Sequence, residues 1–155
     1  SEMKLPDAEL WLIGSMPPEI EPFFEQYAGT YRYLGFVRQN TLHQYYSQAS
    51  LFAICSIQEG LAMVQPQAMA CGLPLLCTTN TGGEDLIEDG KEGFVVPIRD
   101  VEALKEKILF FYEDPDRARD MGQAAKRKVQ TGLTWDDYGD HIVKEYQRVL
   151  GAAGT

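Results

Sequence analysis

Apolar residues are distributed differently before and after residue 100 of the chain. Before it, short apolar runs alternate with segments in which apolar positions recur every three or four residues. Such runs, bounded by glycine or proline, are typical of buried strands, and the longer spacing is typical of helices. The pattern predicts strands at residues 8–15, 31–37, 51–56, 73–79 and 93–97. It predicts helices at residues 17–29, 39–50, 64–72, 82–90, 100–113, 116–130 and 135–150.

The last three predicted helices have recognisable boundaries. Asp100 and Thr134 each precede a helical segment, where a short polar side chain can accept a hydrogen bond from the first turn. Asp114 stands before a proline, and a residue in that position avoids helical backbone. Asp100 and Thr134 therefore predict where the first and the third of these helices begin, and Asp114 predicts where the first one ends.

The run LFAIC at residues 51–55 is apolar at every position rather than at alternate positions. Strands buried on both faces have this pattern, which indicates a parallel sheet covered by helices. The predicted fold class is therefore α/β, a doubly wound parallel sheet with a helical C-terminal tail. We interpret residues 1–150 as one domain and residues 151–155 as a frayed tail. Ligands of such sheets bind beyond the carboxyl ends of the strands. The loops expected there are residues 14–15, 35–38, 56–63 and 78–84.

Composition narrows the class of ligand. The chain has 155 residues, of which 45% are hydrophobic, and this suits a globular domain with a sizeable core. Its formal net charge of −9 argues against nucleic acid or an anionic membrane surface as the main partner. No apolar run has the length of a membrane span, and the first residues lack a signal-peptide pattern. A small anionic ligand held by local dipoles is still compatible with this charge.

Cysteine and histidine give no sign of a metal site. Cys55, Cys71 and Cys77 lie in apolar surroundings, and we interpret them as reduced core thiols rather than a disulfide framework. His43 and His141 are far apart in the sequence, each on a polar helical stretch, and are expected at the surface. We therefore expect no metal.

The stretch CSIQEGLAMVQPQAMACG, residues 55–72, is mostly small and apolar and reads as core, yet it contains the charged Glu59. It leaves the carboxyl end of a predicted strand and enters a helix, where free backbone N–H groups and the helix dipole favour an anion. Pro66 fits a first helical turn, and Gly60 lets the backbone approach a ligand closely. Residues 61–64 could therefore cradle a diphosphate without a basic side chain.

Three polar residues in these loops each have two interpretations. Glu59 could accept hydrogen bonds from hydroxyls or stabilise positive charge, or it is a solvated loop residue. Gln67 lies about two helical turns further on and could reach a sugar ring, or it is an ordinary surface residue. Arg38 could supply positive charge near the phosphates, or it is a solvated charge.

Residues 59–100, EGLAMVQPQAMACGLPLLCTTNTGGEDLIEDGKEGFVVPIRD, resemble the C-terminal domain of family-four glycosyltransferases, which have the GT-B fold. The family pattern is Glu-Gly-Phe-Gly, a second glutamate eight residues after the first, and then Ala-Met-Ala-x-Gly-x-Pro-Val. The pieces DGKEG and PIRD match its later Asp-Gly-x-x-Gly and Pro-x-x-Asp. The helical segments MGQAAKRKV and LTWDDYGDHI are also similar to the family, so the resemblance covers nearly the whole chain.

The resemblance implies a glycosyltransferase of the hexosyltransferase type that uses a nucleotide diphosphate sugar, with retention at the anomeric carbon and without a metal or other cofactor. This domain, the Rossmann-like half of the GT-B fold, would bind the donor. Glu59 would be the catalytic residue, in contact with the sugar hydroxyls, and Gln67 would take the place of the glutamate that binds the ribose. The diphosphate would be bound by the amides of Ala62, Met63 and Val64. The remaining donor-binding positions are Phe36 and Val37 beside the base, Arg38, Gly60, Leu61, and Gly82 and Gly83 on the loop lining the cleft.

The sequence departs from the family pattern in three ways. Gln67 replaces the second glutamate and bonds without charge assistance. Leu61 and Ala62 replace the phenylalanine and the second glycine. The first strand of the family's domain, with its Gly-Arg pair and later lysine, has no match, and neither has the N-terminal acceptor domain. The resemblance thus implies part of a longer enzyme, inactive alone, whose open sheet edge would favour dimerisation or strand exchange.

Two other functions stay open from the sequence. One is a nucleotide-sugar epimerase of the same fold. The other is a non-catalytic domain for binding or assembly, which the residues at positions 62 and 67 keep open. The nucleotide, the sugar and the acceptor are not identified. The expected location is cytoplasmic, with any peripheral membrane attachment supplied by the acceptor domain.

Overall fold

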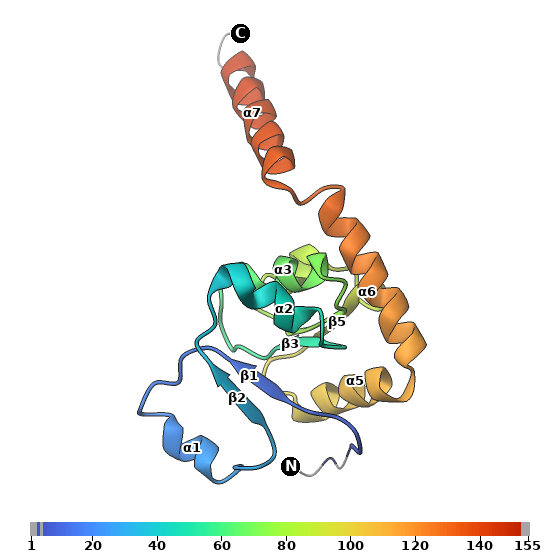
Figure 1. Cartoon of the computed structure of the whole chain (residues 1–155). Coiled ribbons are helices and arrows are strands. Elements are labelled where there is room, and N and C mark those ends of the chain that lie inside the picture. The colour runs from blue at the N-terminus through green and yellow to red at the C-terminus, as the bar shows by residue number, and fades with distance from the viewer. Residues whose placement is uncertain (1–2, 4, 153–155) are drawn as a thin grey trace. The chain divides into compact units, whose positions relative to one another are not determined.

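The computed structural model describes residue 3 and residues 5–152, and the chain divides into a first unit that ends at Tyr45 and a second that begins at Tyr46 (Figure 1). Strands alternate with helices in both units, and every strand pair of the described residues is parallel. The predicted α/β class is confirmed.

The first unit has two strands and a short helix. β1 (Trp11–Ile13) pairs in parallel with β2 (Arg32–Gly35), and α1 (Glu21–Glu25) lies between them in the chain. The helix predicted over residues 17–29 is therefore shortened to five residues. The side chain of its N-cap residue, Ile20, makes no hydrogen bond to the helix start, and none of the described residues of α1 is buried. Neither capping nor packing therefore stabilises a longer helix. β1 pairs only with β2 among the described residues, and self-association through its other edge stays a prediction.

A short 3-10 helix, η1 (Gln39–Thr41), and α2 (Leu42–Tyr46) connect the two units along the chain. His43 is exposed on α2, as expected, while Tyr46 is buried. The second unit contains a three-stranded parallel sheet in the order β3-β4-β5. Its elements are β3 (Phe52–Ile54), α3 (Val64–Ala70), β4 (Leu75–Thr78), α4 (Gly83–Leu86), β5 (Gly93–Val96), α5 (Val101–Glu113), α6 (Pro115–Gln130) and α7 (Trp135–Ala152).

β4 is the central strand of this sheet, and all four of its residues are buried. Leu75 and Cys77 pack with residues of α3, α4 and α6 in one cluster, while Leu76 packs with residues of α5 and α6 in another. This is the alternation that a strand buried on both faces requires. β3 departs from the expectation, since Ala53 is exposed. β3 is one of the two edge strands of this sheet and pairs only with β4 among the described residues.

The predicted helix boundaries are confirmed by their hydrogen bonds. The carboxylate of Asp100 accepts from the backbone N–H of Ala103 at 2.9 Å and caps α5. Asp114 caps α6 in the same way, directly before a proline that occupies its first turn. The Thr134 hydroxyl oxygen accepts from the N–H of Asp137 at 3.1 Å at the start of α7.

The helical C-terminal tail is also confirmed, and α7 continues through Gly151 and Ala152. Residues 153–155 of the predicted frayed tail lie outside the described residues. Several of the large apolar side chains of α7 are exposed. They are Trp135, Tyr138, Val143, Tyr146, Val149 and Leu150. His141, on the same helix, is exposed as expected.

The cysteines are free, as predicted, but only one of the three is fully in the core. Cys77 is buried on β4, and desolvation raises the pKa of its thiol to about 11. Cys71 is half-buried. Cys55, directly after β3, is exposed, so the interpretation of Cys55 as a core thiol is wrong.

The packing of α6 on the turn after α3 leaves no room for a side chain at Gly122. A Cβ there would overlap the carbonyl oxygen of Gly72 and lie 3.1 Å from Pro74 Cδ. We therefore expect Gly122→Ala to lower the free energy of unfolding by about 2 kcal/mol, as overpacking of a core contact does. Urea denaturation with a constant m-value measures this change.

Gly139→Ala on α7 is the matched control, because nothing lies within 4 Å of its added Cβ. Alanine is the better helix former, so the control should be neutral or slightly stabilising. Equal loss of stability in both variants would contradict the packing of α6 on this turn.

Candidate functional site

Two loops leave the carboxyl ends of neighbouring parallel strands in the second unit. The β3 loop (residues 55–63) leads from β3 to α3, and the β4 loop (residues 79–82) leads from β4 to α4. Parallel pairing brings these ends to one edge of the sheet, which is where ligands of α/β sheets bind. Nine of the predicted site residues lie on these loops or on the helices that they begin.

Hydrogen bonds join the two loops. The Glu59 N–H donates to the carbonyl oxygen of Asn80 at 2.8 Å, and the Thr78 hydroxyl donates to the Ser56 carbonyl oxygen at 2.6 Å. The Ala62 N–H makes a longer bond, 3.5 Å, to the carbonyl oxygen of Thr81. Backbone groups that meet in this way fix the course of the β3 loop against the end of β4.

Asn80 has a left-handed backbone conformation, with φ of 69°. Asparagine is one of the few residues with a side chain that adopt it readily. Its own N–H donates to Glu84 Oε1 at 3.1 Å, at the start of α4. The backbone N–H of Glu84 itself, and then this bond from Asn80, hold the pKa of the Glu84 carboxyl below its usual value.

Glu59 is exposed, and the Ser56 hydroxyl lies 3.4 Å from its Oε2 atom. Its neighbours Ile57, Leu61 and Met63 are also exposed, so the interpretation of this stretch as core is wrong before α3 begins. The reason is that residues 55–63 form a loop beyond the sheet. The carboxylate is consequently accessible to a ligand.

The backbone N–H groups of Met63 and Val64 have no hydrogen-bond partner among the described residues, whereas that of Ala62 bonds to Thr81. Met63 is the N-cap of α3 and gives it no side-chain cap. Two of the three amides predicted to bind a diphosphate are therefore available. Gln67 lies half-buried one turn into α3.

A side chain at Gly82 or Gly83 would crowd neighbouring atoms. Gly82 has φ of 73°, and a Cβ on it would stand 3.0 Å from the Leu61 Cα. A Cβ on Gly83 would overlap the sulfur of Cys77 and lie 2.9 Å from Gln65 Oε1. The structure thus brings Gly82 against Gly60 and Leu61.

Phe36, Val37 and Arg38 follow β2 in the first unit. Phe36 is 75% exposed and Val37 is half-buried. Arg38 is exposed and is the N-cap of η1, where its carbonyl oxygen accepts from the Thr41 N–H and hydroxyl. Their contact with a nucleotide base stays a prediction.

Gln65 is a residue of this site that the sequence reasoning missed. It is fully buried at the beginning of α3, and its Nε2 donates to the Thr81 carbonyl oxygen at 2.7 Å. The signal was present in the sequence, because Gln65 precedes Ala68 and Met69 by three and four positions. A polar side chain on the face that these apolar residues share needs a partner.

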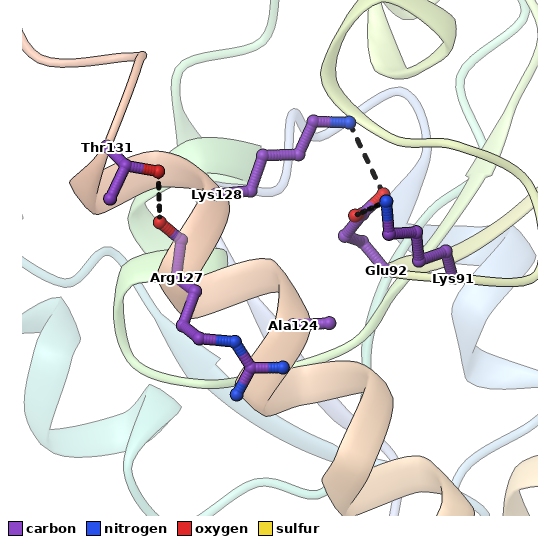
Figure 2. A pocket seen from close by; sticks show the side chains of 6 residues that line it. All are labelled: Lys91, Glu92, Ala124, Arg127, Lys128 and Thr131. Carbon is purple, nitrogen blue, oxygen red and sulfur yellow. Dashed lines mark hydrogen bonds and ion pairs between the residues drawn. The ribbon is translucent and has the colours of Figure 1, made fainter.

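A separate cavity of about 280 Å³ lies near the amino end of β5, at the opposite edge of the sheet (Figure 2). Figure 2 shows the ammonium group of Lys128, from the last turn of α6, directed at the buried Glu92 carboxylate, 3.3 Å away. Lys91 lies 3.9 Å from the same carboxylate, and the Glu88 N–H donates to it at 2.8 Å. Lys91 and Lys128 both pair with the Glu92 carboxylate, and this cluster therefore links α6 to the turn before β5.

Within residues 3 and 5–152, no group of three or more His, Cys, Asp or Glu side chains is arranged to hold a metal ion. Over the same residues, no helix combines the length and the apolar character that a membrane crossing requires.

Comparison with known sequences gives a match over residues 3–128 to the family described as Glycosyl transferases group 1. The chain is 26% identical, over 92% of its length, to the GDP-mannose-dependent monoacylated alpha-(1-6)-phosphatidylinositol monomannoside mannosyltransferase of Corynebacterium glutamicum, of which it covers 39%. It spans less than half the length of the curated relatives that it matches.

Solved structures have the same fold. Sucrose-phosphate synthase from Thermosynechococcus elongatus matches with a TM-score of 0.82 and 26% identity, over 96% of this chain and 40% of that one. Anabaena Alr3699/HepE, in complex with UDP-glucose, matches with a TM-score of 0.72 and 22% identity, over 81% of this chain and 37% of that one. The Rossmann-like half of a GT-B fold expected from the sequence is confirmed.

The buried Glu92 offers a test of the cluster at the far edge. Glu92→Gln keeps an acceptor for the Glu88 N–H but removes the charge that pairs with Lys128. We expect a loss of about 1–2 kcal/mol in the free energy of unfolding, the usual value of a charge-assisted hydrogen bond.

Glu88→Gln is the control for this substitution, because its ion pair with Lys91 is exposed and should contribute nothing measurable to stability. Thermal unfolding at low salt, with both variants side by side, measures the difference. If Glu92→Gln is as stable as Glu88→Gln, the cluster does not fasten α6.

Proposed function

Because the chain belongs to the glycosyl transferases group 1 family, we propose that it is the C-terminal, donor-binding part of a glycosyltransferase. The enzyme would transfer a sugar from a nucleoside diphosphate sugar to an acceptor bound by another domain. The residues described here would bind the donor but would not catalyse transfer by themselves, because the acceptor would be bound by that other domain. The chain covers 39% and 40% of the length of two relatives, which supports separate donor-binding and acceptor-binding domains.

The observation that carries the proposal is the pair of unbonded amides at Met63 and Val64, on a loop whose course is fixed by the end of β4. They lie at the carboxyl edge of a parallel sheet, and backbone N–H groups bind anions without needing a basic side chain. This explains how a chain with a net charge of −9 can accept a diphosphate.

Glu59 would contact the hydroxyls of the donor sugar and act as the catalytic residue. Its exposure beyond the sheet edge and its place four residues before the unbonded Met63 amide support this role. Gln67 would bind the ribose by one donor and one acceptor. We propose retention at the anomeric carbon and a reaction without a metal, both implied by the family resemblance.

The base is not fixed by the proposal, and the relatives suggest which nucleotides to try. The Corynebacterium relative is named as GDP-mannose-dependent, and the Anabaena structure contains UDP-glucose. We propose a cytoplasmic location, which the three free cysteines support, because reducing compartments keep thiols free. No specific contact favours an epimerase or a non-catalytic domain over the transferase.

Nucleotide binding is tested first. On titration with UDP and GDP, we expect amide resonance shifts at Met63, Val64 and Gln67, while Lys128, at the far edge, serves as the internal control. The shifts should be larger for the nucleotide whose base the site accepts. Well-dispersed spectra that do not change with either nucleotide would contradict the proposed function.

The role of Glu59 is tested by separating sugar from diphosphate. Glu59→Gln should leave the affinity for the nucleoside diphosphate unchanged but weaken binding of the nucleotide sugar by about tenfold, the equivalent of one charge-assisted hydrogen bond. Calorimetric titrations of UDP against UDP-glucose, or of GDP against GDP-mannose, measure both affinities.

Glu113→Gln, an exposed glutamate on α5, is the control for the change in net charge. Parallel weakening of nucleotide and nucleotide sugar by Glu59→Gln would show that Glu59 does not contact the sugar.

A further inference from the structure

The side chain of Gln65 connects α3 to the β4 loop. It is fully buried, and its amide group donates to the carbonyl oxygen of Thr81 at 2.7 Å. Thr81 is fully buried as well, and its hydroxyl donates to the Thr78 carbonyl oxygen at 2.7 Å. The bond from Gln65 therefore ends on a residue that is itself tied back to β4.

The carbonyl oxygen of Thr81 accepts from two donors at once. One is Gln65 Nε2, and the other is the Ala62 N–H, 3.5 Å away. The preceding carbonyl, that of Asn80, accepts from the Glu59 N–H. Two consecutive carbonyls of the β4 loop thus orient the backbone on either side of Gly60 and Leu61, and Gln65 holds the second of them in place.

Packing alone does not explain a glutamine at this position. Gln65 Oε1 is buried and has no hydrogen-bond partner in the described structure. A buried amide with one atom unpaired is unfavourable compared with an apolar side chain of similar volume. Gly83 leaves the space in front of this oxygen open, because a Cβ there would lie 2.9 Å from it. Glutamine can donate the hydrogen bond to the Thr81 carbonyl oxygen, whereas an apolar residue cannot.

We propose that Gln65 is a positioning residue that, through the Thr81 carbonyl, holds residues 59–64 in the geometry that binds a nucleoside diphosphate. The ligand in this statement rests on the proposed function, whereas the effect of Gln65 on the loop does not. Gln65 does not touch the donor itself and acts through the backbone of the β4 loop.

Two substitutions of similar size separate the hydrogen bond from the volume. Gln65→Met removes the donor at every pH. Gln65→Glu puts an ionised oxygen against the Thr81 carbonyl at neutral pH, but its protonated form can again donate to that carbonyl. Gln130→Glu, an exposed glutamine on α6, is the matched control for the added charge.

Cys77 on β4 lies next to Gln65 across Gly83, and Glu84 is the next residue of α4. Desolvation raises the pKa of the Cys77 thiol to about 11, so it stays neutral in acidic solution. Hydrogen bonds from its own backbone N–H and from that of Asn80 lower the pKa of the exposed Glu84 carboxyl at the start of α4. Recovery of Gln65→Glu between about pH 7 and pH 5 would then report the new glutamate, whose burial raises its pKa.

The first measurement is made without nucleotide. Amide resonances of Glu59 and Ala62 should shift in Gln65→Met and in Gln65→Glu at neutral pH, and return towards the wild-type positions only in Gln65→Glu on acidification. The second is affinity for UDP or GDP, expected to fall by about fivefold to tenfold in both variants, the equivalent of one neutral hydrogen bond.

Several outcomes decide the matter. Lower thermal stability with unchanged amide positions and unchanged affinity would reduce Gln65 to a structural residue and overturn the proposal. If Gln65→Met does not fold, the pH profile of Gln65→Glu decides, and a flat profile overturns it. If the wild-type chain binds neither nucleotide, the proposed function fails, while the nucleotide-free amide shifts still support or refute the effect of Gln65 on the loop.

Discussion

The second unit depends on the burial of β4 from both sides. Its four residues are buried, because helices cover both faces of the sheet. Leu75 anchors one cluster and Leu76 the other, so neither layer can shift without disturbing the strand. Gly93 of β5 lies so close to the Leu75 backbone that any side chain would collide with it. β4 is accordingly held in register along its length.

The candidate site takes its geometry from this strand. Thr78, the last residue of β4, donates to the carbonyl oxygen of Ser56, and Thr81 donates back to Thr78. The β3 loop begins at an edge strand with an exposed residue, so its own strand constrains it less. Hydrogen bonds to the end of β4 and to the residues that follow it hold the loop in place instead. The loop that carries Glu59 is thus positioned by its neighbour in the sheet rather than by its own strand.

Much of the fold could be predicted from the sequence because it follows from local rules. The apolar run of β4, the caps at Asp100 and Asp114, and the long C-terminal helices each depend on a few consecutive residues. The first unit was predicted less well. Periodicity suggested a helix over residues 17–29, but periodicity does not show whether anything covers its apolar face, and α1 has five residues. The edge position of β3 likewise depends on pairing, which a single strand's composition does not reveal.

For the candidate site, sequence reasoning found the groups that would meet a ligand and missed those that hold them. Glu59 and the amides before α3 follow from a motif and from the chemistry of a helix start. Gln65 acts through a carbonyl sixteen residues away in the chain, so no local pattern connects the two.

Three residues of the second unit that depart from local preferences lie at this edge. Asn80 has a left-handed backbone, Gln65 is a buried amide with an unpaired oxygen, and Gly83 begins a helix where any side chain would collide with Cys77. Each is unfavourable by itself, and together they bring two loops within hydrogen-bonding distance. Departures from local preference concentrate where a protein must hold groups for a ligand rather than for its own stability. Their position beside the loop that carries Glu59 is the physical reason to place the ligand at the carboxyl edge of the sheet.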